Sequence, residues 1–282
     1  MSQLSILHHP APSAEERDFV LARLPGELLP RPGFSLLKHQ TPCDQKVLNE
    51  LREQLTFDIN PLPAHFTPEL VRLIVSDMDS TLIAIECIDE LADCLGLKPQ
   101  VAAITEAAMR GELDFPQALR RRVALLKGLP VEALQQVYEQ RLRFNPGAEI
   151  LIDQARRRGI RTAVVSGGFT FFTERVKARL GMDFALANQL EEKEGRLTGE
   201  VLGEICGAEA KAAFLRQLCE ELGIQTRQCI AIGDGANDLK MLALAGLGVA
   251  YHAKPKVQQQ AAAVLNHSGL EGVCHFLGEA DE

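Results

Sequence analysis

Residues 73–81 read LIVSDMDST, an apolar run that ends in two aspartates and a threonine. A short apolar run predicts a buried strand, and open α/β sheets bind ligands beyond the carboxyl ends of such strands. Side chains alternate along a strand, so we expect Asp77 and Asp79 on the same side. One carboxylate can attack phosphorus while the second handles the proton of the leaving oxygen. The stretch therefore predicts a phosphoryl-transfer site in an α/β protein, with a solvated aspartate-rich turn as the alternative.

Two later apolar runs end in residues that suit the same chemistry. Residues 160–168, IRTAVVSGG, end with a serine and two glycines before a predicted helix, and a hydroxyl with exposed N–H groups at a helix start suits a phosphate. Residues 229–238, CIAIGDGAND, place Asp234 after a third predicted strand, where it can close a cation site opposite Asp77. Because neighbouring carboxylates repel each other, we expect a hard divalent cation with oxygen ligands there, namely Mg²⁺.

A lysine and the order of the motifs add to this interpretation. Lys211 lies near the start of an alanine-rich stretch, residues 207–222, that predicts a helix with leucine and phenylalanine on one face. Taken by itself, a lysine at a helix start is a solvated surface charge. In chain order, however, four motifs resemble those of the haloacid dehalogenase superfamily of phosphatases across residues 70–275. These motifs are Asp77-x-Asp79-x-Thr81, Ser166-Gly167, Lys211 and Gly233-Asp234-Gly235-x-Asn237-Asp238.

The resemblance implies a fold and a role for each matched residue. It implies a Rossmann-like parallel sheet with a helical cap insertion, in which Asp77 is the nucleophile and Asp79 the general acid and base. It also implies that Mg²⁺ is held by the side chains of Asp77 and Asp234 and by the backbone carbonyl of Asp79. The other matched residues would bind the phosphate (Ser166, Gly167, Lys211 and Asn237) or support the metal site and the phosphate from behind (Thr81 and Asp238).

The segment after the first motif resembles the cap of the phosphoserine phosphatases within that superfamily. Glu86 suits the ammonium group of such a substrate, and Arg122 suits its carboxylate because a guanidinium can make two parallel hydrogen bonds. Met109 and Phe115 resemble apolar cap residues that lean over the substrate. Without the resemblance, Glu86 is an acid on a helix face, Arg122 is one of three consecutive solvated arginines, and the two apolar residues are core.

The implied reaction is the Mg²⁺-dependent hydrolysis of a small molecule, O-phospho-L-serine, to L-serine and phosphate through an aspartyl-phosphate on Asp77. That reaction is the last step of serine biosynthesis. The same motifs also suit a phosphotransferase that passes the phosphoryl group to another small alcohol, such as homoserine. A non-catalytic module that senses an amino acid is a third hypothesis, which the cluster of carboxylates disfavours.

Composition excludes several classes of protein. The net charge of −8 and the pI near 5.5 argue against nucleic-acid binding. No apolar run is long enough to span a bilayer, and we expect a cytoplasmic protein. Seven cysteines without a CxxC pair favour reduced thiols over a disulfide framework.

Prolines 61, 63 and 68 interrupt the pattern and predict a domain boundary. We expect a small α/β domain over residues 1–68 and a catalytic domain over 69–282, with a helical cap inserted at about 87–144. The small domain resembles a shortened ACT-like regulatory domain, and a homodimer through it is left open. Its predicted elements are strands at 4–8, 33–39 and 56–59 and helices at 14–24 and 43–55. In the catalytic domain we also expect a strand at 247–251 and a hairpin at 184–201.

Overall fold

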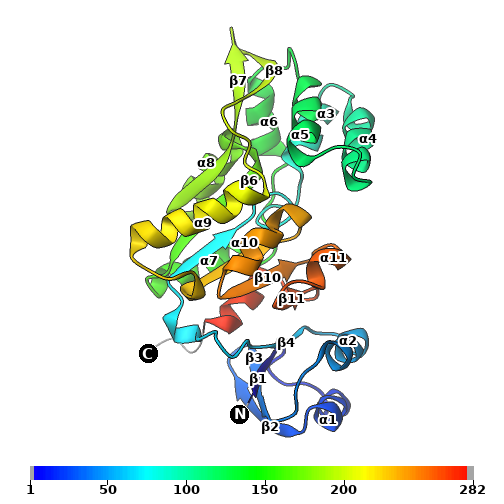
Figure 1. Cartoon of the computed structure of the whole chain (residues 1–282), viewed down its shortest axis with the longest axis vertical. Coiled ribbons are helices and arrows are strands. Elements are labelled where there is room, and N and C mark those ends of the chain that lie inside the picture. The colour runs from blue at the N-terminus through cyan, green and yellow to red at the C-terminus, as the bar shows by residue number, and fades with distance from the viewer. Residues whose placement is uncertain (1–2, 278–282) are drawn as a thin grey trace.

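The computed structural model describes residues 3–277, except for the side chain of Met109, and contains two separate sheets. The first is a four-stranded antiparallel sheet in the order β2-β3-β1-β4, with two helices on one face (Figure 1). This βαββαβ succession is the ferredoxin-like arrangement and agrees with the expected ACT-like unit. Its elements are β1 (Gln3–Leu7), α1 (Ala14–Arg23), β2 (Gly26–Arg31), β3 (Phe34–His39), α2 (Gln45–Gln54) and β4 (Ile59–Pro61).

Two details of this unit differ from the sequence-based expectation. Strand β2 was not predicted, and the last strand begins at Ile59 instead of residue 56. Strand β2 lies at the edge of the sheet, and it is half-exposed and contains a glycine and a proline. These residues weaken the alternating signal on which strand prediction depends.

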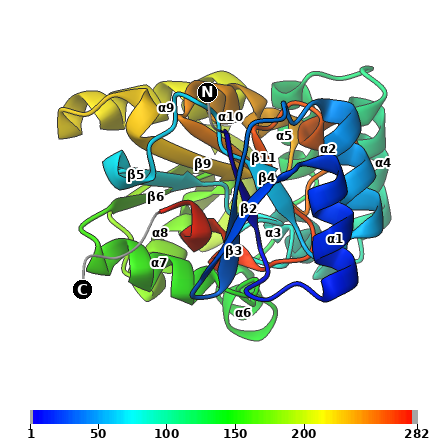
Figure 2. The same cartoon turned by 90° about the horizontal axis from the view of Figure 1, so that it is seen from below.

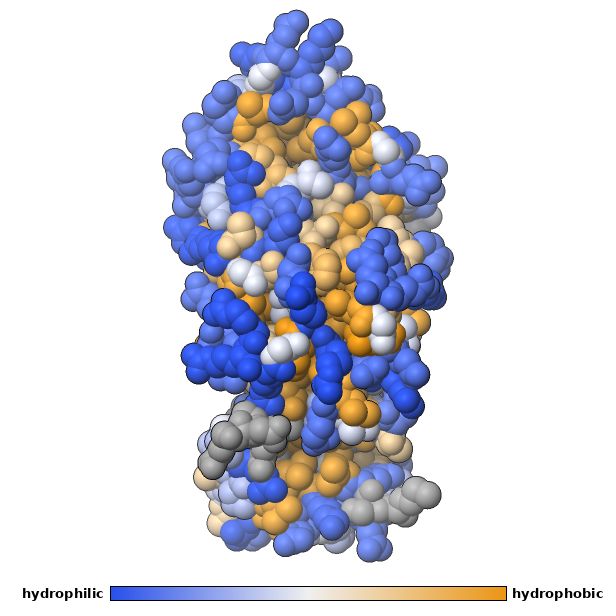
Figure 3. All heavy atoms as spheres, turned by 90° about the vertical axis from the view of Figure 1, so that its left-hand side faces the viewer, coloured by the Kyte–Doolittle hydropathy of each residue, from blue (hydrophilic) through white to orange (hydrophobic). Residues whose placement is uncertain are grey.

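The face of this sheet that points away from α1 and α2 is only partly covered. Alternation puts Ile6 and Leu36, which are paired across β1 and β3, on that face together with Leu4. Ile6 packs into the core of the rest of the molecule, whereas Leu4 remains 36% exposed. Figure 3 shows apolar side chains gathered over this lower part of the molecule.

The second sheet has seven strands in the order β11-β10-β9-β5-β6-β7-β8 and is parallel except for β8. Helices α9 and α10 cover one face, and α7 and α8 cover the other (Figure 2). The predicted strands and the predicted hairpin of this sheet are confirmed. So are the helix predicted after residue 168 and the helix predicted over residues 207–222. The strands are β5 (Leu73–Ser76), β6 (Arg161–Phe169), β7 (Phe184–Lys193), β8 (Arg196–Leu202), β9 (Cys229–Gly233), β10 (Leu247–Tyr251) and β11 (Ala263–Leu265). The helices are α7 (Ala148–Arg157), α8 (Thr170–Leu180), α9 (Ala208–Leu222), α10 (Leu239–Leu244) and α11 (Pro255–Gln258).

A helical cap is inserted between β5 and α7, as expected. Its helices are α3 (Cys87–Asp93), α4 (Lys98–Met109), α5 (Phe115–Ala124) and α6 (Glu132–Gln140). The two chain segments that lead into and out of the cap lie beside each other: the Ala84 N–H donates to the Arg143 carbonyl at 2.9 Å, and the Asn145 N–H donates to the Leu82 carbonyl at 2.9 Å. The segment that follows α5 contacts the β7–β8 hairpin, because the Gly128 N–H donates to the Leu197 carbonyl.

The small sheet is joined to the last strand of the large one. Asn60 in β4 both donates to and accepts from the backbone of Val264 in β11. The buried Asp58 carboxylate accepts hydrogen bonds from three consecutive backbone N–H groups, residues 266–268. No helix within residues 3–277 is long and apolar enough to cross a bilayer.

Candidate active site

Three strand ends meet at one edge of the large sheet, because β5 lies between β9 and β6. Asp77 follows β5, Ser166 lies in the last part of β6, and Asp234 follows β9. A cavity of about 550 Å³ opens between this edge and the cap. Of the residues expected from the sequence, the cavity lining includes Asp77, Asp79, Glu86, Phe115, Arg122, Ser166, Gly167, Asp234 and Asn237.

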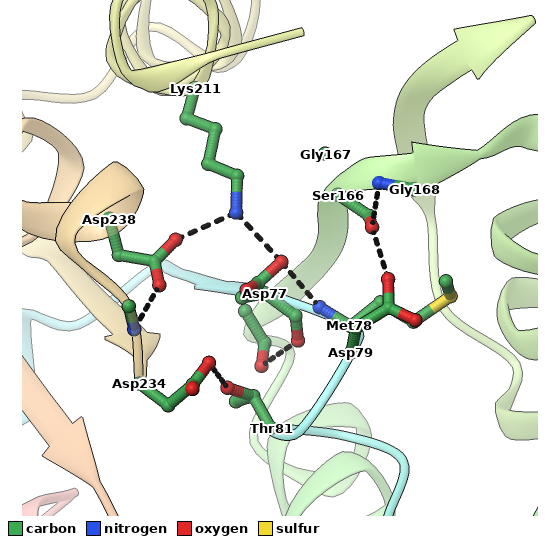
Figure 4. A network of polar contacts seen from close by, with 12 residues as sticks. Asp77, Met78, Asp79, Thr81, Ser166, Gly167, Gly168, Lys211, Asp234 and Asp238 are labelled. Atoms are coloured by element: carbon green, nitrogen blue, oxygen red, sulfur yellow. Dashed lines mark hydrogen bonds and ion pairs between the residues drawn. The ribbon is translucent and has the colours of Figure 1, made fainter. Parts of the chain in front are cut away.

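Lys211 lies fully buried beneath this cavity and joins two carboxylates (Figure 4). Its Nζ is 2.7 Å from Asp77 Oδ1 and 2.7 Å from Asp238 Oδ1. Burial by itself lowers the pKa of this ammonium, but Asp238 and Asp77 outweigh burial and hold the pKa above its usual value. Burial and the nearby Asp238 raise the pKa of Asp77 well above its usual value, although Lys211 opposes them. Lys211 is therefore a buried counter-ion of the first aspartate and not a solvated surface charge.

Three carboxylates at this edge form a candidate cation site. Asp77, Asp234 and Asp238 each offer one oxygen, and these oxygens lie within 4.8 Å of one another. Burial and Asp238 raise the pKa of Asp234 to about 6, although Lys254 lowers it in part. Three hard oxygen donors fit a divalent cation, and the raised pKa values of Asp77 and Asp234 reflect the burial and mutual repulsion that such an ion would relieve.

The hydrogen bonds separate the roles of these three acids. Asp238 is occupied on both oxygens, with Oδ1 on Lys211 and Oδ2 accepting from the Gly235 N–H at 2.9 Å. In the described chain, Asp77 and Asp234 use only Oδ1: Asp77 accepts from the Met78 N–H, and Asp234 accepts from Thr81 Oγ1 at 3.3 Å. The second oxygen of each is therefore available to a ligand.

Asp79 is fixed by two hydrogen bonds beside the Ser166 turn. Its Oδ1 accepts from the Cys87 N–H at 2.9 Å, and its Oδ2 accepts from Ser166 Oγ at 2.8 Å. The same hydroxyl accepts from the Gly168 N–H at 2.7 Å. A Cβ at Gly168 would lie 2.6 Å from the Asp79 carboxylate, so this close approach requires glycine. The turn thus holds a hydroxyl and a carboxylate together at the cavity wall.

The cap supplies an acid to the opposite wall. Glu86, which precedes α3, accepts from Ser80 Oγ at 2.8 Å. Glu86 is exposed and lines the cavity, yet the surrounding protein and the nearby Asp79 raise the pKa of its carboxyl to about 7.

The cap also supplies a cation. The Nε of Arg122, in α5, is buried and has no hydrogen-bond partner among residues 3–277. The neighbouring Arg120 and Arg121 are exposed and do not line the cavity. Arg122 is thus the one of the three consecutive arginines that lines the cavity, and its buried donor is available to an anion.

Phe115 forms part of the roof of the cavity. It starts α5, and its ring would lie 2.8 Å from a Cβ at Gly167 and 3.3 Å from one at Gly207. The ring therefore covers the Ser166 turn directly. The other apolar candidate, Met109, ends α4, but its side chain lies outside the described part of the structure.

At the cavity, or directly behind the Ser166 turn that lines it, lie three polar residues that the sequence-based interpretation did not select. Lys254 precedes α11 and Asp89 lies in α3, and both side chains line the cavity. Asn188 in β7 is buried, donates to the carbonyls of Gly167 and Gly168, and accepts from the Cys206 N–H. A polar residue inside an apolar strand was a usable signal for Asn188, whereas a single lysine and a single aspartate had none.

Comparison with known proteins gives consistent results. Residues 74–243 match the family model for haloacid dehalogenase-like hydrolases. A phosphoserine phosphatase from Polaromonas sp. is 53% identical over 214 residues, which cover 73% of this chain and 91% of that protein. A haloacid dehalogenase-family hydrolase from Salmonella enterica superposes with a TM-score of 0.88 at 33% identity, covering 99% of both chains. A phosphoserine phosphatase solved as a phospho-aspartyl intermediate analogue has a TM-score of 0.69 at 40% identity, covering 73% of this chain and 99% of its own.

The family model spans the cap and the strands from β5 to β9. The Salmonella structure covers nearly the whole chain and so includes the small sheet as well. The expected fold class, an α/β protein with a parallel sheet, a helical cap and a small N-terminal α/β unit, is confirmed. The matching model covers more than half of the chain, including β5, β6 and β9, whose ends form the cavity edge. The chain belongs to the haloacid dehalogenase-like hydrolase family.

Proposed function

We propose that this enzyme hydrolyses O-phospho-L-serine to L-serine and phosphate with Mg²⁺. One observation carries the proposal: the same cavity joins phosphoryl-transfer residues at the sheet edge to an acid, Glu86, and a cation, Arg122, on the cap. The buried Nε of that cation has no hydrogen-bond partner within residues 3–277. A phosphate, an ammonium and a carboxylate on one small molecule would each meet a group of opposite charge or a hydrogen-bond donor. The names of the Polaromonas and other relatives support the same substrate.

The proposed reaction begins with attack by Asp77 Oδ2 on phosphorus, since Oδ1 is engaged by Lys211 and the Met78 N–H. Asp79, protonated at that moment, donates its proton to the departing serine oxygen. Asp79 then takes a proton from water, which attacks the aspartyl-phosphate and releases phosphate. Phosphate oxygens would be held by Ser166, the Gly167 N–H, Lys211 and Asn237, as positioning is the main requirement of phosphoryl transfer.

Mg²⁺ would be held by the side chains of Asp77 and Asp234 and, by resemblance to the family, by the backbone carbonyl of Asp79. When bound, the ion neutralises charge on the phosphoryl oxygens. Thr81 holds Asp234, and Asp238 holds Lys211, so both act by orienting groups that touch the substrate or ion.

The substrate assignment is tested by phosphate release from O-phospho-L-serine, phosphothreonine, phosphotyrosine and a sugar phosphate. We expect a strong preference for phosphoserine in Mg²⁺ and loss of turnover in EDTA. Added homoserine should not capture the phosphoryl group, which separates hydrolysis from phosphotransfer. Equal turnover of the four compounds would leave a phosphatase but refute the substrate.

Replacing Arg122 should weaken binding of the substrate carboxylate. In Arg122→Leu we expect the KM for phosphoserine to rise roughly 10- to 100-fold, the usual cost of losing a hydrogen bond to a charged group. The KM for p-nitrophenyl phosphate, which has no carboxylate, should change little. Arg121→Leu, on the exposed side of the same helix, is the matched control and should behave as wild type. Equal losses for the two substrates would contradict the assignment.

Titration of Glu86 should make the activity fall on the acidic side of the pH profile. Its pKa is raised to about 7, so below that pH it is protonated and loses the charge that attracts the substrate ammonium. We expect kcat/KM for phosphoserine to fall about tenfold per pH unit below 7, since this ratio reports the free enzyme. In Glu86→Gln we expect low activity and a kcat/KM that no longer falls in this way below pH 7. Glu132, which is exposed elsewhere on the cap, gives the control: Glu132→Gln should show the same fall as wild type. An unchanged fall in Glu86→Gln would assign it to another group.

We also propose the wider setting of the reaction: a cytoplasmic enzyme completing serine biosynthesis, divided into a regulatory domain at 1–68 and a catalytic domain at 69–282. The two sheets support the division. A homodimer through the small sheet is supported by the apolar side chains on its uncovered face (Figure 3). A mass from light scattering that matches a single chain would refute the dimer.

A further inference from the structure

Two buried cysteines lie outside the active-site cavity, where α9 and β9 meet. Cys219 is in the second half of α9, and Cys229 is the first residue of β9. Their Sγ atoms are 3.3 Å apart, and the two residues are 4% and 0% exposed. The proposed mechanism uses neither of them. Among residues 3–277, no other two cysteine sulfurs make such a contact.

We propose that Cys219 and Cys229 form a reversible thiol–disulfide site that responds to peroxides. The sulfur atoms already face each other, and a bond needs their separation to shorten to about 2.05 Å. The intervening segment, residues 220–228, consists of the helix end and a short surface turn in which most residues are exposed or half-buried. It carries none of the residues of the active site, so it can adjust without moving a catalytic group.

The surroundings of the two thiols decide which reacts first. Burial raises the pKa of both sulfhydryl groups. The contact between the two sulfur atoms partly lowers the pKa of Cys219 and raises the pKa of Cys229 further. The Cys229 thiol also contacts the Gln225 carbonyl, at 3.8 Å. Cys219 is the less buried of the two, and the sulfur contact partly lowers its pKa, so it is the thiol that loses its proton and attacks first, while Cys229 is the resolving thiol.

The reaction balances with a peroxide as the oxidant. The Cys219 thiolate attacks one oxygen of hydrogen peroxide, the O–O bond breaks, and hydroxide leaves to give a sulfenic acid. The Cys229 sulfur, losing its proton, then attacks the Cys219 sulfur, the S–O bond breaks, and the hydroxyl leaves as water. Two thiols and one peroxide give one disulfide and two waters, and a dithiol reductant reverses the change.

The bridge would tie together two elements that the active site depends on. Helix α9 carries Lys211 in its first turns, and β9 leads directly to Asp234. Oxidation would thus cross-link the far ends of these elements, below the sheet edge where the carboxylates meet. The site is independent of the proposed substrate, because it involves none of the cavity residues.

Peptide mapping of the full chain tests the proposal. The protein is treated with hydrogen peroxide, unfolded, alkylated and digested with trypsin without reductant. Cleavage after Arg216, Arg227 and Lys240 separates the cysteines into peptides 217–227 and 228–240. We expect these two peptides to be joined by a disulfide, to separate when a reductant precedes alkylation, and to remain unjoined in Cys219→Ser.

Exposed Cys94 provides the internal measure of how far oxidation has gone. If its thiol is consumed while both peptides remain fully alkylated, the proposal is refuted. Sulfinic acid on Cys219 without the joined peptides, or a bridge from Cys219 to a different cysteine, refutes it as well. If Cys219→Ser fails to fold, the wild-type protein with and without reductant still decides the question.

Discussion

In Asp77→Asn, turnover of phosphoserine should fall roughly 10⁴-fold or more, as expected when the nucleophile is removed from a set of catalytic residues that act together. An amide cannot attack phosphorus, whereas it preserves the size of the side chain and can still accept from the Met78 N–H. Phosphate release measures the rate, and intact mass after rapid acid quenching measures the phosphoenzyme. Both signals should disappear in this variant.

Asp79→Asn is the matched comparison, because it removes the proposed acid and base but keeps the nucleophile. With p-nitrophenyl phosphate, whose leaving group needs no proton, the first step should still occur. Water then lacks its base, so the phosphoenzyme should accumulate in this variant and not in Asp77→Asn. Turnover of Asp77→Asn within tenfold of wild type, or a phosphoenzyme in that variant, would remove Asp77 as the nucleophile.

The part of the site that could be predicted comes from three strands with polar ends, which are neighbours in the sheet. Asp77, Ser166 and Asp234 each follow or end an apolar run, and the sheet order then brings the three ends together. Such residues are predictable because strand periodicity and sheet topology restrict their positions together. The resemblance added Lys211, which by composition alone is an ordinary helix lysine and yet is fully buried.

The rest of the site depends on tertiary contacts that leave no periodic trace in the sequence. Lys254 and Asp89 line the cavity only because the start of α11 and helix α3, which are far apart in the sequence, both border it. Arg122 differs from Arg121 only in the side of α5 on which it lies, and nothing in a run of three arginines identifies that side. Strand β2 was not predicted because a half-exposed edge strand with a glycine and a proline has almost no alternation.

The buried lysine gives the largest expected effect on stability. Lys211→Met should lower the free energy of unfolding at pH 7 by about 3–5 kcal/mol, the range for breaking a buried ion pair from one side. The loss arises because Asp77 and Asp238 are left buried without their shared cation, both within 2.7 Å of its former position. Urea unfolding at several pH values measures it. Lys240→Met, which breaks an exposed ion pair with Glu209, is the matched control and should change stability by less than about 1 kcal/mol.

The pH dependence separates lost charge from lost packing. Without Lys211 the pKa of Asp77 rises further above its usual value, so between the unfolded and folded pKa values the folded state binds more protons than the unfolded state. Stability therefore falls as pH rises through that window, and the deficit of Lys211→Met should be largest near neutral pH and should narrow toward pH 4. The double variant Lys211→Met/Asp238→Asn should recover part of the loss, because one of the two uncompensated charges is gone. A deficit that is constant with pH, or no recovery in the double variant, would mean that Lys211 stabilises the fold by packing and not as the counter-ion of the nucleophile.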